Sequence, residues 1–298
     1  RRPDYCQQPA SLTPHAKDGA PFRDAKMDNA TYQEMPCISS HWLKDMLDSP
    51  AECYRKHLDP QRPVQESTKA MQFGTLVHCL ALTPLQFSEE FIIESRHGRS
   101  QVKKARYAEL KTTGMIIITP DEFERAQAIV TAMKAHPEAR LLLTGGKKEQ
   151  TIIQERGPGL LPLKARLDLH HPDQRRVVEL KTSYDLDKIK TTMQRYRYPL
   201  SAAFYRELAQ ALTVVFIFVQ TREPFDVAVF ELSPLDLQEG REQFTTALHR
   251  FDECWLKNEW PEAEPVAPDL DDDPLMINFM PMNPNRQRFE LPVGELAL

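Results

Sequence analysis

Apolar residues recur every three to four positions in three segments before residue 140, which predicts amphipathic helices. Ser39 or Ser40 caps the first helix, and Ser49-Pro50 closes it, because proline cannot continue a helix. A second helix is expected over residues 68–82. A third is expected over residues 120–136, where Pro-Asp-Glu is a typical helix start.

From about residue 150 the period changes to alternation of apolar and polar residues, which predicts strands. The expected strands cover residues 150–156, 161–170, 175–182, 213–220 and 225–231. Gly157-Pro158-Gly159 and His171-Pro172-Asp173 separate the first three strands as turns. Long helices are expected over residues 189–212, between the third and fourth strands, and over residues 234–260.

These elements predict one α/β domain over residues 37–262, with a central mixed β-sheet flanked by helices. Residues 1–36 contain five prolines among small polar residues, and we expect an extended or partly disordered arm there. Residues 263–298 contain Asp271-Asp272-Asp273 and several prolines, which predicts an acidic, proline-rich tail.

Composition limits the functional classes. The 298 residues are 41% hydrophobic, enough for a core, and the net charge of −5 gives no overall sign of a nucleic-acid binder. Five widely spaced cysteines without a C-x-x-C pair indicate reduced thiols in a cytoplasmic protein. No apolar run approaches the ~18 residues that span a bilayer, and the first residues do not resemble a signal peptide.

The candidate chemistry lies in two consecutive strands. Along the run Val178-Glu179-Leu180-Lys181, alternation places Glu179 and Lys181 on one face. The hairpin turn can bring Asp168 of the preceding strand beside Glu179. Two carboxylates with an adjacent ammonium suit a divalent cation and a water poised to attack a phosphodiester. The alternative is a solvent-exposed Glu-x-Lys ion pair, which is common on half-exposed strands.

Two further pairs have the same ambiguity. Gly74 and His78 lie one helical turn apart, so that the imidazole can face a metal while the glycine lets another backbone approach. Gln194 and Tyr198 are also four residues apart on an expected helix, and their amide and phenol suit phosphate oxygens. A buried structural histidine, a surface glutamine and a half-buried tyrosine are the alternatives.

The order G-x-x-x-H, Asp, E-x-K and Q-x-x-x-Y resembles the RecB-like branch of the PD-(D/E)xK nucleases. More narrowly, the chain is similar to the RecE-type exonucleases (exodeoxyribonuclease VIII) over about residues 38–260. The resemblance implies a restriction-endonuclease-like core and a 5′-to-3′ exonuclease on double-stranded DNA ends. It also implies a product with 3′ overhangs, for use in recombination and repair by a single-strand annealing protein of the RecT type.

The resemblance also implies a site. His78, Asp168, Glu179 and the carbonyl of Leu180 would hold Mg²⁺, for which Mn²⁺ can substitute, with Asp168, Glu179 and Lys181 as catalytic residues. Gln194 and Tyr198 would contact the substrate. Leu167 stands where the family name has proline. A first-strand glutamate often joins such sites, and both Glu149 and Glu155 are candidates.

A basic cluster precedes the third helix and is a candidate DNA-binding arm or a solvated loop. Its members are Arg96, Arg99, Lys103, Lys104 and Arg106. The chain lacks a phosphate-binding loop for an ATP motor. We therefore expect processivity to come from a closed homo-oligomeric ring, a tetramer by the resemblance, with a monomer or dimer as the alternative. Rival functions are an endonuclease on the same fold and a non-catalytic DNA-binding or scaffold protein.

Overall fold

The most apolar strand of the chain lies at the centre of the fold. In β7 (Thr213–Gln220) every residue after the first is buried, and β6 (Arg176–Ser183) pairs with it in parallel along its whole length. Strands that are buried on both faces consist of nearly continuous apolar residues, because helices cover the sheet from both sides. The sequence of β7, Thr-Val-Val-Phe-Ile-Phe-Val-Gln, therefore accounts for its central position.

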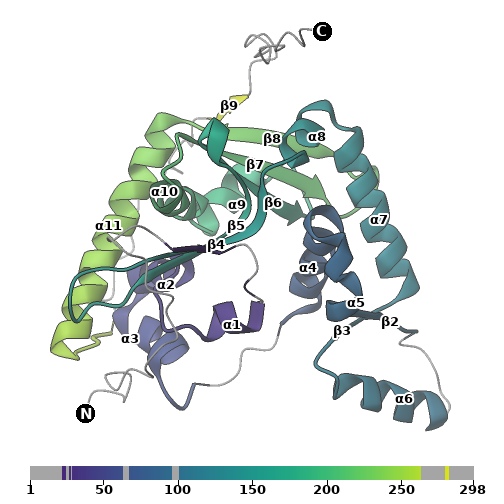
Figure 1. Cartoon of the computed structure of the whole chain (residues 1–298), viewed down its shortest axis with the longest axis horizontal. Helices are drawn as coiled ribbons and strands as arrows, with labels where there is room; N and C mark the ends of the chain where they lie inside the picture. The colour runs from purple at the N-terminus through teal and green to yellow at the C-terminus, as the bar shows by residue number, and fades with distance from the viewer. Residues whose placement is uncertain are drawn as a thin grey trace, which may run out of the picture.

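The computed structural model describes residues 22–24, 27, 29–62, 67–95, 101–262 and 279–281. In these residues one seven-stranded mixed sheet has the order β1-β4-β5-β6-β7-β8-β9 (Figure 1). The other strands of this sheet are β1 (Phe22–Asp24), β4 (Lys147–Gln154), β5 (Leu163–His171), β8 (Val227–Leu232) and β9 (Phe279–Pro281). Among the described strands of this sheet, β6 and β7 form the only parallel pair of neighbours.

Two helical layers enclose the sheet. Val214, Phe216 and Phe218 of β7 join a core with α2 (Ser40–Asp48), α10 (Tyr198–Ala209) and α11 (Pro234–Lys257). The alternate residues of β7 join a second core with α4 (Lys69–Leu82), α7 (Pro120–Ala135) and α8 (Pro137–Leu143). The two layers are visible on opposite sides of the sheet in Figure 1.

The remaining elements are short. They are α1 (Asn29–Glu34), α3 (Pro50–Cys53), α5 (Phe87–Glu90), β2 (Phe91–Ile93), α6 (Gln101–Lys111), β3 (Ile116–Ile118) and α9 (Ile189–Arg195). A π-helical turn follows α3, and single 3₁₀ turns precede α5 and link β5 to β6. β2 and β3 form a separate parallel pair, and α6 lies beyond them, away from the large sheet (Figure 1).

The predicted fold class, a central mixed sheet flanked by helices, is confirmed. The predicted helix starts have a physical basis, since Thr68 accepts a hydrogen bond from the Met71 amide at the start of α4. At the start of α7, Thr119 and Glu122 form a reciprocal capping box. None of the described helices is both long and apolar enough to cross a membrane.

The structure differs from the predicted secondary structure in several places. The helix expected over residues 189–212 is divided into α9 and α10, because Arg197 takes a left-handed backbone with φ of 46°. The segment expected to be an extended arm contains α1, which Lys164 of β5 holds by donating to the carbonyls of Tyr32 and Met35. Helices α6 and α8 and the strand pair β2–β3 were not predicted.

Candidate active site

The pairing between β5 and β6 ends in the middle of both strands. The ladder runs from His171–Arg176 to Leu169–Val178 and is not continued beyond it. Leu167 and Leu169 join the two opposite cores, although strict alternation would place them on one face. The regular pleat of β5 is therefore interrupted at Asp168.

Beyond the end of the ladder, two backbone amides donate to side-chain carboxylates instead of to backbone carbonyls. The Leu180 amide donates to Asp168 Oδ2 at 2.7 Å, and the Asp168 amide donates to Glu179 Oε1 at 3.4 Å. Buried backbone donors need acceptors, so these hydrogen bonds fix both carboxylates where β5 and β6 are no longer paired. We call this place the opening between β5 and β6. The opening between β5 and β6 thus orients the two acidic side chains predicted from the sequence.

Lys181 completes this group. Its Nζ lies 2.9 Å from Glu179 Oε2 and 3.5 Å from Asp168 Oδ2. The Glu179 side chain is only 3% exposed, whereas that of Lys181 is 25% exposed. The structure therefore brings Asp168, Glu179 and Lys181 together, with the ammonium as the solvent-accessible member of the Glu179–Lys181 pair.

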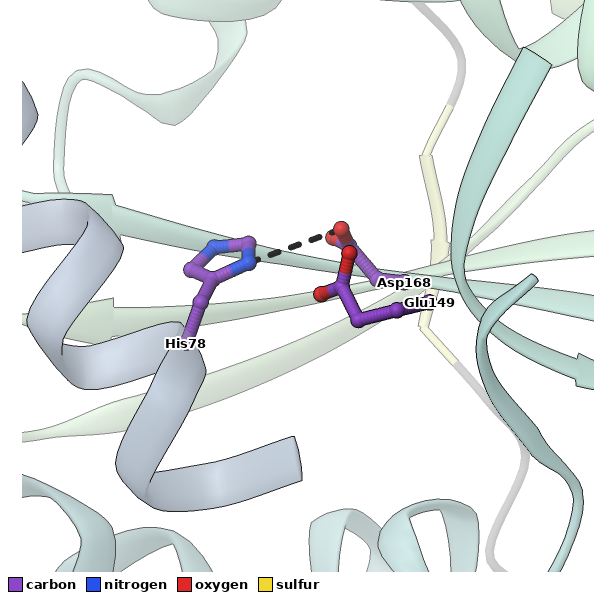
Figure 2. A group of neighbouring side chains, drawn as sticks. All are labelled: His78, Glu149 and Asp168. Carbon is purple, nitrogen blue, oxygen red and sulfur yellow. Dashed lines mark ion pairs between the residues drawn. The ribbon is translucent and has the colours of Figure 1, made fainter. Parts of the chain in front are cut away.

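A second group of ligand atoms reaches Asp168 from the side of α4. His78 projects from α4 toward the sheet, and its Nδ1 lies 3.5 Å from Asp168 Oδ1 (Figure 2). One ligand atom each from His78, Glu149 and Asp168 lie within 4.8 Å of one another. Glu179 is not in this group, because its carboxylate turns to Lys181.

Of the two first-strand glutamates, only Glu149 lies near Asp168 in the structure. Lys148 pairs with Leu169 and Gln150 with Leu167, so Glu149 lies opposite Asp168 in the register. Glu149 has a φ of 49°, so β4 is irregular at the same level at which β5 is interrupted. Glu155 follows the end of β4 and is exposed.

The acidic groups perturb one another strongly. Burial and the neighbouring Asp168 carboxylate raise the pKa of Glu149 to about 7, and the same two causes raise the pKa of Glu179 to about 7. Burial opposes the ionisation of Asp168, but Lys181 and His78 outweigh it and hold its pKa well below the ordinary value. Three carboxylates crowded in this way form a site at which added positive charge is favourable.

The donor set fits a divalent cation. Carboxylate oxygens are the preferred ligands of Mg²⁺ and Mn²⁺, and imidazole is also a ligand for first-row divalent metals. Mg²⁺ usually keeps several waters and takes only one or two carboxylates from a protein. His78, Glu149 and Asp168 can therefore supply the protein ligands of such an ion. The Leu180 amide donates to Asp168, and the ligand role of the Leu180 carbonyl stays a prediction.

The Lys181 side of the site opens into a cavity of about 430 Å³. Its walls are α2, the elbow between α9 and α10, and the face of β6 that carries Glu179. Half-buried Lys44 of α2 lies in this wall, and its Nζ is 5.4 Å from the centre of the Tyr198 ring. Burial and then the nearby Lys181 lower the pKa of Lys44 to about 7, so an anion in the cavity would stabilise its charge.

The predicted pair Gln194 and Tyr198 is not one helical face, because the break at Arg197 separates them. Tyr198 lines the cavity, but Gln194 is not among the lining residues. Ser201 and Tyr205 lie four residues apart on α10 and both line the cavity, and Tyr205 Oη is 3.1 Å from Ser40 Oγ. Sequence reasoning missed these two residues and Lys44. Pro199, inside the predicted helix, is the signal that marks the break, because proline is tolerated in the first turn of a helix but not in its interior.

The structure bears on two other predictions, the close backbone approach at Gly74 and the basic cluster. A Cβ on Gly74 would lie 3.4 Å from Thr182 Oγ1, an ordinary contact with a side chain, so a close backbone approach does not require the glycine. In the basic cluster, Arg106 of α6 is exposed and pairs with Glu109 at 3.1 Å. Arg96 and Arg99 lie outside the described residues, as do the side chains of Lys103 and Lys104.

Comparison with known proteins identifies the family of the chain and a solved structure with a similar fold. A family model described as "PDDEXK-like domain of unknown function (DUF3799)" matches residues 39–265. A solved structure from Eubacterium rectale described as "Putative exonuclease" is 16% identical with a TM-score of 0.57, covering 82% of this chain and 91% of that chain. A "phage related exonuclease" from Haemophilus somnus 129PT is 12% identical with a TM-score of 0.32, covering 74% and 96%. No curated protein matches the chain significantly.

Proposed function

The chain belongs to the PDDEXK-like family DUF3799, and from this premise we propose that it is a Mg²⁺-dependent exodeoxyribonuclease acting on linear double-stranded DNA. One observation carries the proposal. The ligand atoms of His78, Glu149 and Asp168 converge within 4.8 Å directly beside the Glu179–Lys181 ion pair. Metal ligands next to a positioned ammonium are what phosphodiester hydrolysis requires, because its transition state gathers charge on phosphate oxygens.

The metal site would be formed by His78, Glu149 and Asp168. A divalent cation held there would activate the attacking water and would offset negative charge on the phosphate. Asp168 is the residue common to both parts of the site, since it contacts His78 on one side and Lys181 on the other. The Leu180 amide keeps the Asp168 carboxylate in this position.

Lys181 is the proposed catalytic lysine. Glu179 holds its ammonium at 2.9 Å, and a quarter of the Lys181 side chain is accessible from the cavity side. In this place the ammonium can donate to the attacking water and to an oxygen of the scissile phosphate. Such a donor acts mainly on the charge that develops in the transition state, so its loss should lower the rate more than binding.

The finer parts of the proposal rest on the RecE-type resemblance in the sequence. They are 5′-to-3′ polarity, 3′ single-stranded products passed to an annealing protein of the RecT type, and a closed ring, a tetramer, around the DNA. Tyr198 in the cavity wall supports a substrate contact, and Gln194 is retained as a second candidate. The segment from Arg96 to Arg106 is proposed as a DNA-binding arm, supported by exposed Arg106 on the outlying helix α6.

Linear and circular plasmid DNA separate the proposal from its rivals. Each is incubated with the protein and Mg²⁺ or EDTA, and with Lys181→Ala as the inactive control. Mg²⁺-dependent loss of the linear form alone is expected. Nicking of circles would indicate an endonuclease, and no Mg²⁺-dependent loss of either would indicate a non-catalytic DNA-binding protein. Duplexes labelled at the 5′ or the 3′ end then report the polarity, and sedimentation reports the oligomeric mass.

A further inference from the structure

Four aromatic rings form a continuous column from the core of the sheet to the cavity. Phe218 and Phe216 of β7 stack with centroids 5.9 Å apart, and Phe216 stacks on Tyr198 at 5.5 Å with an interplanar angle of 13°. Tyr198 in turn stacks on Tyr196 at 5.9 Å and 23°. The inner two rings are almost completely buried, whereas Tyr196 is 51% exposed. The column therefore ends at the cavity wall in Tyr196, a ring that is about half exposed.

The elbow that carries Tyr196 is held firmly. Arg197 adopts its left-handed conformation while donating to the Lys44 carbonyl at 3.1 Å and to Asp48 Oδ1 at 2.6 Å. On the other side, α11 packs so closely that a Cβ on Gly240 would overlap the Pro199 carbonyl. Contacts with two helices thus fix the backbone beside Tyr196, and the ring needs little ordering when a ligand binds.

The surroundings of Tyr196 suit a nucleotide. The Arg195 guanidinium lies over the Tyr196 ring, 5.8 Å from its centre, and Lys44 lines the same cavity. The cavity leads from these two cations to Glu179 and Lys181. An exposed aromatic ring flanked by cations offers stacking to a base and charge to its phosphates, without selecting a sequence.

We propose that Tyr196 is a stacking platform for a nucleobase of the DNA strand that enters the cavity, and that it positions that strand for cleavage. This inference rests on the proposed nuclease function. It makes Tyr196 a positioning residue, since the ring would contact a base next to the scissile bond and would not contact the metal ligands. Stacking on every base alike also fits an enzyme that must accept any sequence.

The test compares Tyr196→Ala with Tyr196→Phe and with Tyr184→Ala. Tyr184 is the matched control, because it is 70% exposed and lies under the Arg222 guanidinium at 4.8 Å, but does not line the cavity. Cleavage is measured on a natural duplex and on duplexes with a single abasic nucleotide at each successive position from the end. Thermal melts verify that all three variants are folded.

Tyr196→Ala should lower kcat/KM on the natural duplex by about 5- to 150-fold, while the phenylalanine variant and Tyr184→Ala remain near wild type. An abasic nucleotide at one position should lower wild-type cleavage to the same level, and Tyr196→Ala should add no further loss there. An equal loss with Tyr196→Ala on every abasic substrate, or no loss on the natural one, would overturn the proposal.

A DNA-binding measurement distinguishes failure of this inference from failure of the proposed nuclease function. A duplex with 2-aminopurine near its end is titrated with the protein in Ca²⁺ in place of Mg²⁺. Wild type and Tyr196→Phe should quench the 2-aminopurine fluorescence through stacking, and Tyr196→Ala should not. If no variant cleaves DNA, quenching that depends on Tyr196 still supports the platform, and equal quenching by all variants rejects it.

Discussion

Strand β6 is hydrogen-bonded to β7 along its whole length, from Arg176 to Ser183, but to β5 only as far as Val178. On the β7 side the backbone groups satisfy one another and the side chains are free to pack in two apolar cores. On the β5 side, the amides beyond the end of the ladder bind the carboxylates of Asp168 and Glu179 instead.

The difference shows how one strand serves two purposes. A complete ladder leaves no backbone donor to orient a polar side chain, whereas an interrupted ladder provides donors at fixed positions. The interruption also lets His78 from one helical layer and Lys181 from the opposite face of β6 reach the same aspartate. We therefore expect changes at the β5 side to affect chemistry and changes at the β7 side to affect stability.

The largest expected effect is that of Lys181→Ala. Loss of the ammonium beside Glu179 should lower the cleavage rate by on the order of 10³-fold or more, because the group acts on transition-state charge. The melting temperature and DNA binding should stay near wild type. Lys188→Ala is the control, since Lys188 is 76% exposed and pairs weakly with Asp185. Near-wild-type turnover by Lys181→Ala would remove the lysine from the mechanism.

On the β7 side, Ile217→Ala should act on stability alone. Ile217 is fully buried between the sheet and the helices of the α4 layer, so truncation leaves a cavity. The free energy of unfolding should fall by about 2–5 kcal/mol in urea denaturation. Activity per folded molecule should be retained at low temperature. A large loss of activity in the folded variant would show that the two sides of β6 are not separable.

Substitutions of Glu149 and Glu155, the two first-strand glutamates, test the metal site on the β5 side. Glu149→Gln removes a charge opposite Asp168 and should weaken activity on the order of 10-fold at limiting Mg²⁺, because affinity follows the number of charged ligands. Glu155→Gln should behave as wild type, since Glu155 is exposed beyond the end of β4. Initial rates against Mg²⁺ concentration measure both variants. Equal effects of the two changes would contradict the assignment of Glu149.

A smaller effect is expected for His78→Ala. One neutral ligand is lost, so activity should fall several-fold at low Mg²⁺ or Mn²⁺ and recover in part at high metal concentration. If His78 were a structural histidine, its replacement would lower the melting temperature and added metal would not restore activity. Rates against metal concentration beside a thermal melt decide between these outcomes.

The sequence predicts the regular strands and helices better than the irregular backbone around the acidic site. The strands and helices follow from periodicity and from caps such as Thr68, and the triad of Asp168, Glu179 and Lys181 follows from hairpin geometry. The position of Glu149 opposite Asp168 depends on strand register and on a positive φ at a non-glycine residue. No sequence pattern predicts either of these features.

The cavity wall depends on tertiary structure in the same way. Lys44 belongs to a helix far from the motifs in sequence, and only packing of α2 against α10 places it opposite Tyr198. Because the helix breaks at Arg197, Ser201 and Tyr205 line the cavity and Gln194 does not. Proline at position 199 was the local signal, since proline is tolerated in the first turn of a helix, where Pro199 lies in α10, but disrupts a helix interior.

Metal binding to the purified protein tests the central claim most directly. Titration calorimetry with Mn²⁺ alone, without DNA, should show binding to wild type and to Glu155→Gln. Asp168→Asn should remove or greatly weaken it, because Asp168 supplies the carboxylate shared by both parts of the site. Undiminished Mn²⁺ binding by the folded Asp168→Asn variant would contradict a metal centre at the opening between β5 and β6.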